Sequence, residues 1–385
     1  MFTADGGFYD NKFRLPYTGG PFAVSQTFNN SIAGGVAQLT LDHPFPSTSG
    51  PLTGNINASG VIPNLGIPLM QQWNLTLERQ LGANWGVRAS YVGSRVTQGW
   101  YQRDVNRPPA STIPYSSSRA LIAGFNSINF MDKGANSRYH AMQLGFNHRY
   151  RDGFSIEGLF QWINSMDDVG DNGSDTTGIG IENPYCRSCE KAKSPFEDSL
   201  DFRSNFYYEM PFGRKKRFGA GANRLLNGII GNWVTSGIVD IRNGRPYTVV
   251  FSGTDTSNTN LQGGRADILP GCNVYGSSGL KEPYINIGCF AVPKNGTFGN
   301  ASRAAFRKPG SWDVSGSIYK YFPIFRESVK LRINATITNL FNHPTWDDVG
   351  NNISVPSTFG KLLSQGATGR NAGPRSMVFQ AQLQW

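Results

Sequence analysis

The sequence lacks long apolar runs. Its 385 residues are 38% hydrophobic, and no stretch approaches the ~18 consecutive apolar residues that a membrane-spanning helix needs. Helical membrane spans are therefore excluded, whereas spanning strands, in which apolar and polar residues alternate, are not. The first ten residues, MFTADGGFYD, also lack the basic and apolar regions of a secretory signal peptide. If the chain is exported, we therefore expect it to be a piece of a longer protein.

Constellations of catalytic or cofactor-binding residues are also missing. Residues 219–224 contain Gly219 and Gly221 but lack the third glycine of a dinucleotide-binding loop. Although the net charge is +10, the basic residues are scattered and the aromatic residues follow strand periodicity, so nucleic acid is not an expected partner. No metal-like spacing relates the four histidines, His43, His140, His148 and His343. We expect neither an enzyme nor a bound cofactor.

An acidic segment at residues 167–175 allows two interpretations. It contains Asp167, Asp168, Asp171 and Asp175, which could hold calcium together with loop carbonyls. The aspartate spacing and the glycine of an EF-hand loop are absent. A solvated acidic loop is therefore favoured over a calcium site.

The last ten residues show the period-2 alternation of a strand with one apolar and one polar face. The apolar positions are Met377, Phe379, Ala381, Leu383 and the final aromatic residue, Trp385. Glutamines occupy positions 380, 382 and 384 between them. Such a strand is typical of the closing strand of an outer-membrane β-barrel. We predict that Phe379, Leu383 and Trp385 form the C-terminal membrane-insertion signal.

Similar alternation defines nine strands in all. We predict them at residues 70–80, 85–96, 139–150, 154–165, 199–210, 232–251, 310–322, 328–340 and 376–385, with a break at 243–246 in the sixth. A short strand at 125–131 and a weak one at 7–15 would raise the number to eleven. Residues 1–69 are rich in Gly, Pro, Asn and Ser and are expected to be mostly loop, whereas residues 70–385 form the strand-rich domain.

The connections between these strands alternate in length. Short turns at 81–85, 151–153 and 323–327, and a longer one at 211–229, alternate with loops of roughly thirty to sixty residues. Short periplasmic turns and long extracellular loops are typical of outer-membrane barrels. The sequence therefore predicts an all-β fold, a partial antiparallel transmembrane β-barrel of about 9–11 strands, whose last strand ends at the periplasmic rim.

The four cysteines lie in pairs within two of the long loops. Cys186 and Cys189 are three residues apart, and Cys272 and Cys289 share the longest loop. In an oxidising compartment each pair would form a local disulfide. Free thiols, or a zinc site made from all four cysteines, are the alternatives.

Six short motifs carry a resemblance to a known family. They are residues 71–75 (QQWNL), 91–94 (YVGS), 137–143 (SRYHAMQ), 211–213 (PFG), 231–233 (GNW) with 244–246 (GRP), and 339–344 (NLFNHP). Together they resemble the C-terminal barrel of TonB-dependent receptor-like proteins, in particular the Oar-like group with a carboxypeptidase-regulatory-like domain. The resemblance implies an outer-membrane location and a barrel of about 22 strands in a complete member. It gives His343 a structural role.

The resemblance also implies partners. They are outer-membrane lipid, the barrel assembly machinery, and an upstream plug and barrel sequence or a second chain that completes the barrel. We expect no plug domain and no TonB box in this chain, and the solute is unknown.

Polar and aromatic residues outside these motifs could contact lipid or solutes. We expect Arg88, Arg203, Lys330 and Arg332 to face the barrel lumen. The basic run at residues 214–217 is either a solvated turn or a contact with anionic head groups at the periplasmic leaflet. Four aromatic residues in the loops could stack on a ligand or simply pack within the loops. They are Trp100, Tyr101, Tyr115 and Trp346.

Three functional hypotheses follow. The first is a barrel segment of a TonB-dependent receptor-like protein that takes up a solute across the outer membrane. The second is an independent porin-like or structural outer-membrane barrel. The third is a secreted, soluble β-sandwich that binds carbohydrate through loop aromatics. Detergent dependence separates the third hypothesis from the others, and an upstream plug sequence separates the first from the second.

Overall fold

A computed structural model describes strands β1 (Ile32–Ala33) and β2 (Val36–Ala37) and residues 56–169, 181–275, 283–325, 329–365 and 373–384. The strand expected at residues 7–15 and the final residue, Trp385, lie outside the described residues. Within the described residues no helix is long and apolar enough to span a membrane.

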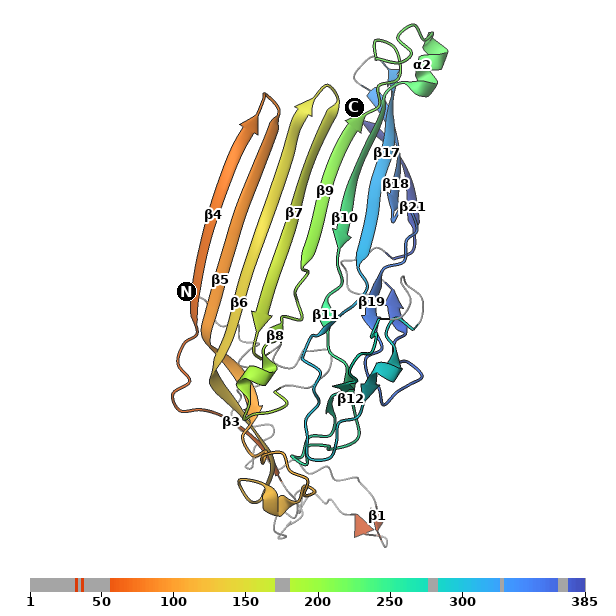
Figure 1. Ribbon diagram of the computed structural model, residues 1–385. Helices are drawn as coiled ribbons and strands as arrows, with labels where there is room; N and C mark the ends of the chain where they lie inside the picture. The colour runs from red at the N-terminus through yellow and green to blue at the C-terminus, as the bar shows by residue number, and fades with distance from the viewer. Residues whose placement is uncertain are drawn as a thin grey trace.

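Nine long strands form one antiparallel meander (Figure 1), in which each strand pairs with the next long strand along the chain. They are β4 (Leu69–Leu81), β5 (Trp85–Asp104), β6 (Phe125–Arg151), β7 (Phe154–Asp167), β9 (Leu200–Glu209), β10 (Trp233–Arg242), β17 (Ser311–Phe325), β18 (Val329–Thr338) and β21 (Ser376–Gln384). Two short strands, β3 (Ile56–Val61) and β8 (Ala192–Lys193), pair with β6 and β7 and bring the sheet to eleven strands. The predicted all-β fold with nine long antiparallel strands is confirmed, whereas the two additional strands are not those predicted, and β3 pairs with β6 in parallel.

Two strands differ from the sequence prediction. The segments predicted separately at 125–131 and 139–150 belong to the single strand β6. The break predicted at 243–246 is confirmed, but the continuation of the same strand to 251 is wrong, because β10 ends at Arg242 and the chain then leaves the sheet. Gly244 explains the departure, since a Cβ atom built there would lie 1.6 Å from the carbonyl oxygen of Lys308. Only glycine permits this close backbone approach.

The register aligns the alternating residues into an apolar and a polar face. One row across the sheet pairs Leu75, Tyr91, Met142, Trp162 and Leu200 in succession. The neighbouring row, one residue away, pairs Thr76, Ser90, Gln143, Gln161, Asp201 and Arg242. Large side chains of the apolar face stand exposed, including Leu77 at 66% and Trp162 at 57%. Such a face is suited to lipid rather than water.

The connections are sorted by length between the two ends of the sheet (Figure 1). Residues 82–84, 152–153 and 210–232, the last containing helix α2 (Arg224–Ile230), lie at the end where the chain terminates. The long connections 105–124, 168–199, 243–310 and 339–375 lie at the other end. This is the predicted arrangement of short and long connections.

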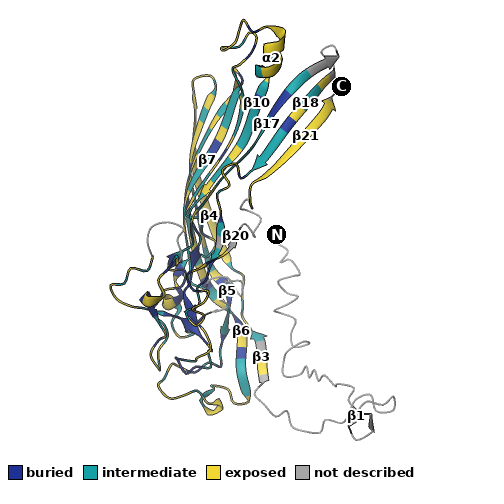
Figure 2. Cartoon of the chain, turned by 90° about the vertical axis from the view of Figure 1, so that its right-hand side faces the viewer, coloured by how far each residue is buried: buried dark blue, intermediate teal, exposed yellow. Residues whose placement is uncertain are grey.

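The sheet does not close on itself within the described residues. Strands β4 and β21 are the two ends of the strand order, and each pairs with one neighbour only. Every residue of β4 is exposed, and β21 is exposed along its described length (Figure 2). Two edges with unpaired backbone groups are therefore left at opposite sides of the sheet.

The main hydrophobic core lies in the long connections rather than in the sheet. Its members come from residues 243–310 and 339–375: Tyr247, Val249, Ala266, Ile285, Cys289, Phe290, Phe306, Val349, Phe359 and Leu362. Short strand pairs frame this core: β11 (Pro246–Tyr247) with β16 (Phe306–Arg307), β12 (Val250–Phe251) with β13 (Gly264–Arg265), β14 (Asp267–Ile268) with β15 (Phe290–Ala291), and β19 (Trp346–Val349) with β20 (Leu362–Gln365). Three 3-10 turns, η1 (Ser117–Arg119), η2 (Arg187–Glu190) and η3 (Ile287–Cys289), also lie in these connections. We call the described parts of the four long connections the loop module; Figure 2 shows its buried residues gathered at that end.

Candidate functional site

Side-chain to backbone hydrogen bonds join the four connections of the loop module. Arg107 donates to the carbonyl oxygens of Ile181 and Glu182 at 3.2 and 3.1 Å. Arg119 donates to the carbonyl oxygen of Asn258 at 2.8 Å. The connection at 339–375 is joined to the connection at 243–310 through Asn351, whose side-chain amide donates to the carbonyl oxygen of Thr248 at 2.8 Å. The long connections therefore form one folded unit at the end of the sheet.

Two disulfides lie in the loop module, as the cysteine positions favoured. Cys186 is bonded to Cys189 and Cys272 to Cys289, with Cα–Cα distances of 5.3 and 5.4 Å. Cys289 is fully buried within the hydrophobic core. Because all four sulfurs are used in these bonds, the alternatives of free thiols and of a four-cysteine zinc site are wrong.

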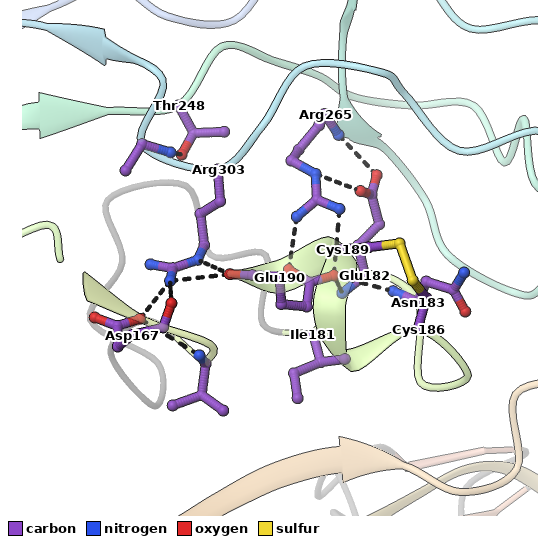
Figure 3. A network of polar contacts seen from close by, with 12 residues as sticks. Asp167, Ile181, Glu182, Asn183, Cys186, Cys189, Glu190, Thr248, Arg265 and Arg303 are labelled. Atoms are coloured by element: carbon purple, nitrogen blue, oxygen red, sulfur yellow. Dashed lines mark hydrogen bonds and ion pairs between the residues drawn. A yellow bond between two sulfur atoms is a disulfide. The ribbon is translucent and has the colours of Figure 1, made fainter. Parts of the chain in front are cut away.

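A buried ion-pair network lies beside the first disulfide (Figure 3). The guanidinium of Arg265 contacts Glu182 through Nε at 2.7 Å and Glu190 through Nη1 at 2.6 Å. The side chains of Glu182 and Glu190 are each 1% exposed, and that of Arg265 is 6% exposed. Isolated charges at this depth are costly, so removal of one partner alone would destabilise the loop module.

The two carboxyl groups share a single guanidinium in this network. Burial raises the pKa of Glu182 to about 7, against the opposing attraction of Arg265, and the neighbouring Glu190 raises it further. The backbone N–H of Arg265 also donates to Glu182 Oε1 at 2.8 Å. Burial outweighs the attraction of Arg265 and of the nearby Arg107, so Glu182 holds a proton more readily than an exposed glutamate does.

A second arginine, Arg303, connects this network to the sheet. Its Nε and Nη2 donate to the carbonyl oxygen of Glu190 at 3.2 and 3.1 Å. Its Nη2 also pairs with the carboxylate of Asp167, the last residue of β7. The next residue, Ala304, donates its backbone N–H to Thr248 Oγ1 at 2.9 Å. The network thereby fixes the 243–310 connection to the end of β7.

Two of the four aspartates considered for calcium binding form ion pairs with arginines instead. Asp167 is paired with Arg303, and Asp168 with Arg187 at 2.9 Å. Asp171 and Asp175 lie outside the described residues. Within the described residues no group of three or more His, Cys, Asp or Glu side chains could hold a metal ion.

Sequence reasoning did not find the ion-pair network. Arg265 lies 83 residues from Glu182 and 75 from Glu190, and Arg303 lies 136 from Asp167. No local pattern links residues so far apart. The nearest signal was the acidic residue Asp167, to which the calcium hypothesis gave a different role.

The polar face of the sheet carries a ladder of charges. Arg203 donates to Asp240 Oδ2 through Nε and Nη2 at 3.0 and 2.6 Å. Arg242 donates to the two oxygens of the same carboxylate at 2.6 and 2.7 Å. Arg88 lines a cavity of about 390 Å³ on this face, together with Glu78 and Asn147.

The other two basic residues predicted to face the lumen belong to the same polar face. Arg332 pairs in register with Gln382, and Lys330 with Gln384. The guanidinium of Arg332 lies 4.3 Å from the ring centre of Tyr319.

The loop aromatics considered for ligand stacking have packing partners. Tyr101 is buried, and the guanidinium of Arg187 lies 4.1 Å from its ring centre. Trp100 donates its indole N–H to the carbonyl oxygen of Gly66 at 3.0 Å. Trp346 packs against the core of the loop module. Tyr115 is half-buried in the 105–124 connection.

The C-terminal strand places its apolar residues on the apolar face of the sheet. In the register of β21 with β18, Phe379 pairs with Ala335 and Leu383 with Leu331. Phe379 is 75% exposed, the largest exposed fraction among the apolar residues of β21. The side chain is therefore available to lipid or to another protein.

Comparisons with known proteins match the chain to a protein family and to several solved structures. A family model described as an outer membrane beta barrel domain matches residues 3–377. Among solved structures, the chain is similar to the outer membrane transporter YddB from Escherichia coli, at 12% identity and a TM-score of 0.42, over 87% of this chain and 34% of that one. No curated protein sequence matches the chain.

Two further solved structures are similar at comparable levels. FpvA from P. aeruginosa matches at 9% identity and a TM-score of 0.39, over 81% of this chain and 26% of that one. BauA, the ferric preacinetobactin receptor from Acinetobacter baumannii, matches at 10% identity and a TM-score of 0.39, over 82% of this chain and 29% of that one. The chain therefore spans about a third or less of the length of these three proteins.

Proposed function

Because the chain belongs to the outer membrane β-barrel domain family, which places it in the outer membrane, we propose that its sheet forms part of the wall of a TonB-dependent receptor-type barrel for solute uptake. The apolar face would contact lipid, and the polar face would line the lumen. The loop module would cover the external mouth. Since the nine long strands form one sheet, the chain is not the soluble β-sandwich considered above.

The observation that carries the proposal is the charge ladder on the polar face. Arg203 and Arg242 both pair with Asp240 at 2.6 to 3.0 Å, and Arg242 also lies 4.0 Å from the carboxylate of Asp201. In a barrel of about 22 strands the lumen is wide enough to hold a plug domain, and a charged, compensated wall suits that setting. Small closed barrels instead fill their interior with side chains.

The open edges imply that further strands complete the barrel. In hydrocarbon each unsatisfied backbone group costs several kcal/mol, so β4 and β21 require partners. We infer that upstream sequence or a second chain supplies the missing strands and the plug. The C-terminal strand, with Phe379 and Leu383 on its apolar face, would be recognised by the barrel assembly machinery, with Trp385 completing the signal.

Pore measurements in liposomes test this proposal. Three preparations are compared: the chain alone, the chain with the strands that complete the barrel, and the completed barrel with its plug. We expect solute flux only from the second preparation, because the plug blocks the third and open edges prevent the first from inserting. Discrete flux from the chain alone would favour the independent porin-like barrel. Equal flux with and without the plug would contradict a plugged receptor.

A further inference from the structure

Two arginines lie directly opposite each other on the apolar face, near the loop module. Arg95 of β5 pairs with Arg138 of β6 in antiparallel register, and Tyr91 pairs with Met142 four residues away. Side chains on one face of a strand recur at every second residue. Arg95 and Arg138 therefore share the face of Tyr91 and Met142, which is the face turned toward lipid.

This arrangement leaves two positive charges facing each other. Like charges directly opposite on neighbouring strands are destabilising. Both arginines are exposed, and neither forms an ion pair with any residue in the described part of the chain. The nearby carboxylates are already used, because Asp167 pairs with Arg303 and Asp168 with Arg187.

A cavity of about 480 Å³ brings a third cation to the two arginines. Arg95, Arg138 and Lys191 line it together with Met166, which pairs in register with Arg138. The remaining lining residues are polar or acidic: Asn136, Ser137, Asp167 and Asp168. Lys191 is also exposed and likewise has no ion pair among the described residues. Three positive side chains and two carboxylates thus line one cavity, and both carboxylates are already paired with arginines outside it, Arg303 and Arg187.

The cavity lies at the expected level of lipid head groups. Trp85 marks the short-turn end of β5, and Arg95 is ten residues further along the strand. At ~3.4 Å per residue and a strand tilt of ~40°, this separation corresponds to about 26 Å along the membrane normal. The apolar band of an outer-membrane barrel is ~25 Å tall. Arg95 therefore lies at its outer boundary, just beyond the aromatic side chains of Trp73, Tyr91 and Trp162 on the same face.

We propose that this cavity binds the phosphate group of a lipid in the external leaflet of the outer membrane. The planar guanidinium groups of Arg95 and Arg138 each offer paired N–H donors that match phosphate oxygens, and Lys191 adds a point charge. A bound phosphate relieves the repulsion between the two arginines. Acyl chains of the same lipid would lie along the apolar face below. The site depends on the outer-membrane location and not on the uptake proposal.

Lipid titration by native mass spectrometry tests the site. The barrel is extracted from outer membranes in a non-ionic detergent, with whatever chain completes it. The probes are bisphosphorylated lipid A, the same lipid after dephosphorylation, and inorganic phosphate. We expect saturable binding of the phosphorylated lipid, at least tenfold weaker binding of the dephosphorylated lipid, and no binding of inorganic phosphate at the same concentration.

Variants identify the residues responsible. The double variant R95Q/R138Q and the single variant K191Q should each weaken binding of the phosphorylated lipid by tenfold or more and leave binding of the dephosphorylated lipid unchanged. Arg149→Gln, on the same strand as Arg138 but at its short-turn end, is the matched control and should bind as the wild type. Equal binding of the two lipids, or binding unaffected by R95Q/R138Q, would overturn the proposal. Tight binding of inorganic phosphate would assign the cavity to a free anion instead of a lipid.

Discussion

The ammonium group of Lys320 donates a hydrogen bond to the backbone carbonyl oxygen of Ile229 at 2.9 Å. Lys320 pairs in register with Trp233 on the apolar face of the sheet, yet it is only 2% exposed. The ammonium also lies 5.3 Å from the ring centre of Trp233 and 5.0 Å from that of Phe322. The positive charge of Lys320 on the lipid-facing side is thus stabilised by a carbonyl group in the last turn of helix α2, where the helix dipole favours a cation. The contact fixes the 210–232 connection to the outside of the sheet.

Lys320→Met should loosen this connection. A hydrogen bond from a charged group contributes about 1.5–3 kcal/mol, which corresponds to roughly a tenfold or greater rise in local opening. Trypsin cleavage within the basic run at residues 214–217 should accelerate by that factor in the intact barrel. Lys330→Met, on the polar face, is the control and should leave the cleavage rate unchanged. Unchanged cleavage in K320M would show that the contact does not hold the connection.

Gly244→Ala should disrupt the loop module. The new Cβ atom would lie 1.6 Å from the carbonyl oxygen of Lys308, so the backbone must shift. We expect a loss of more than about 3 kcal/mol in the unfolding free energy of the module, beyond the usual cost of overpacking. Urea unfolding followed by hydrogen exchange of residues 243–310 measures it. Gly221→Ala, which meets no atom within 4 Å, is the matched control and should change stability little. A G244A variant as stable as G221A would refute this account of the break in the strand.

The two disulfides should contribute unequally to stability. Cys272 and Cys289 are 17 residues apart, whereas Cys186 and Cys189 are three apart. In the chain-entropy account a loop of about 15 residues gives ~3 kcal/mol, and shorter loops give less. C272S/C289S should therefore destabilise the loop module by about 3 kcal/mol, and C186S/C189S by clearly less. Equal losses, measured by the same urea titration, would contradict this ranking.

The buried carboxyl of Glu182 should make the loop module less stable as pH rises. Its pKa is about 7 in the folded protein against an ordinary value of 4.5. A proton bound more tightly in the folded state contributes stability that is fully present below pH 4.5 and lost as pH rises through about 7. Urea titrations between pH 4.5 and 8 should show this decline. Glu182→Gln, which cannot ionise, should flatten it, whereas Glu157→Gln in β7 should not. A decline that persists in E182Q would assign the pH dependence to another group.

The sheet could be predicted from the sequence because its information is local. In β18, for example, Leu331, Ile333, Ala335 and Ile337 alternate with polar residues, and this pattern alone fixes the strand and its faces. The sorting of short and long connections followed from the same strand boundaries. The end of β10 could not be predicted in full, since it depends on the approach of Gly244 to Lys308, 64 residues away.

The loop module could not be predicted for the same reason. Its core joins Tyr247, Phe290 and Phe359 across two connections that look like turn-rich loops in the sequence. The ion pairs of Arg265 and Arg303 also form between residues far apart in the sequence, and no spacing of these residues predicts them. Cysteine pairs within single loops were the exception, because proximity in the chain limits their partners.

Gel mobility of the unheated protein tests the central claim, that this sheet is one part of a larger barrel. A closed outer-membrane barrel migrates as a compact band until it is boiled, whereas a sheet with open edges has no folded form that resists detergent. We predict that the 385-residue chain expressed alone aggregates or is degraded, and that a heat-modifiable band appears only when the remaining strands are supplied. A compact, heat-modifiable band from the chain alone, together with discrete channel conductance, would contradict the claim.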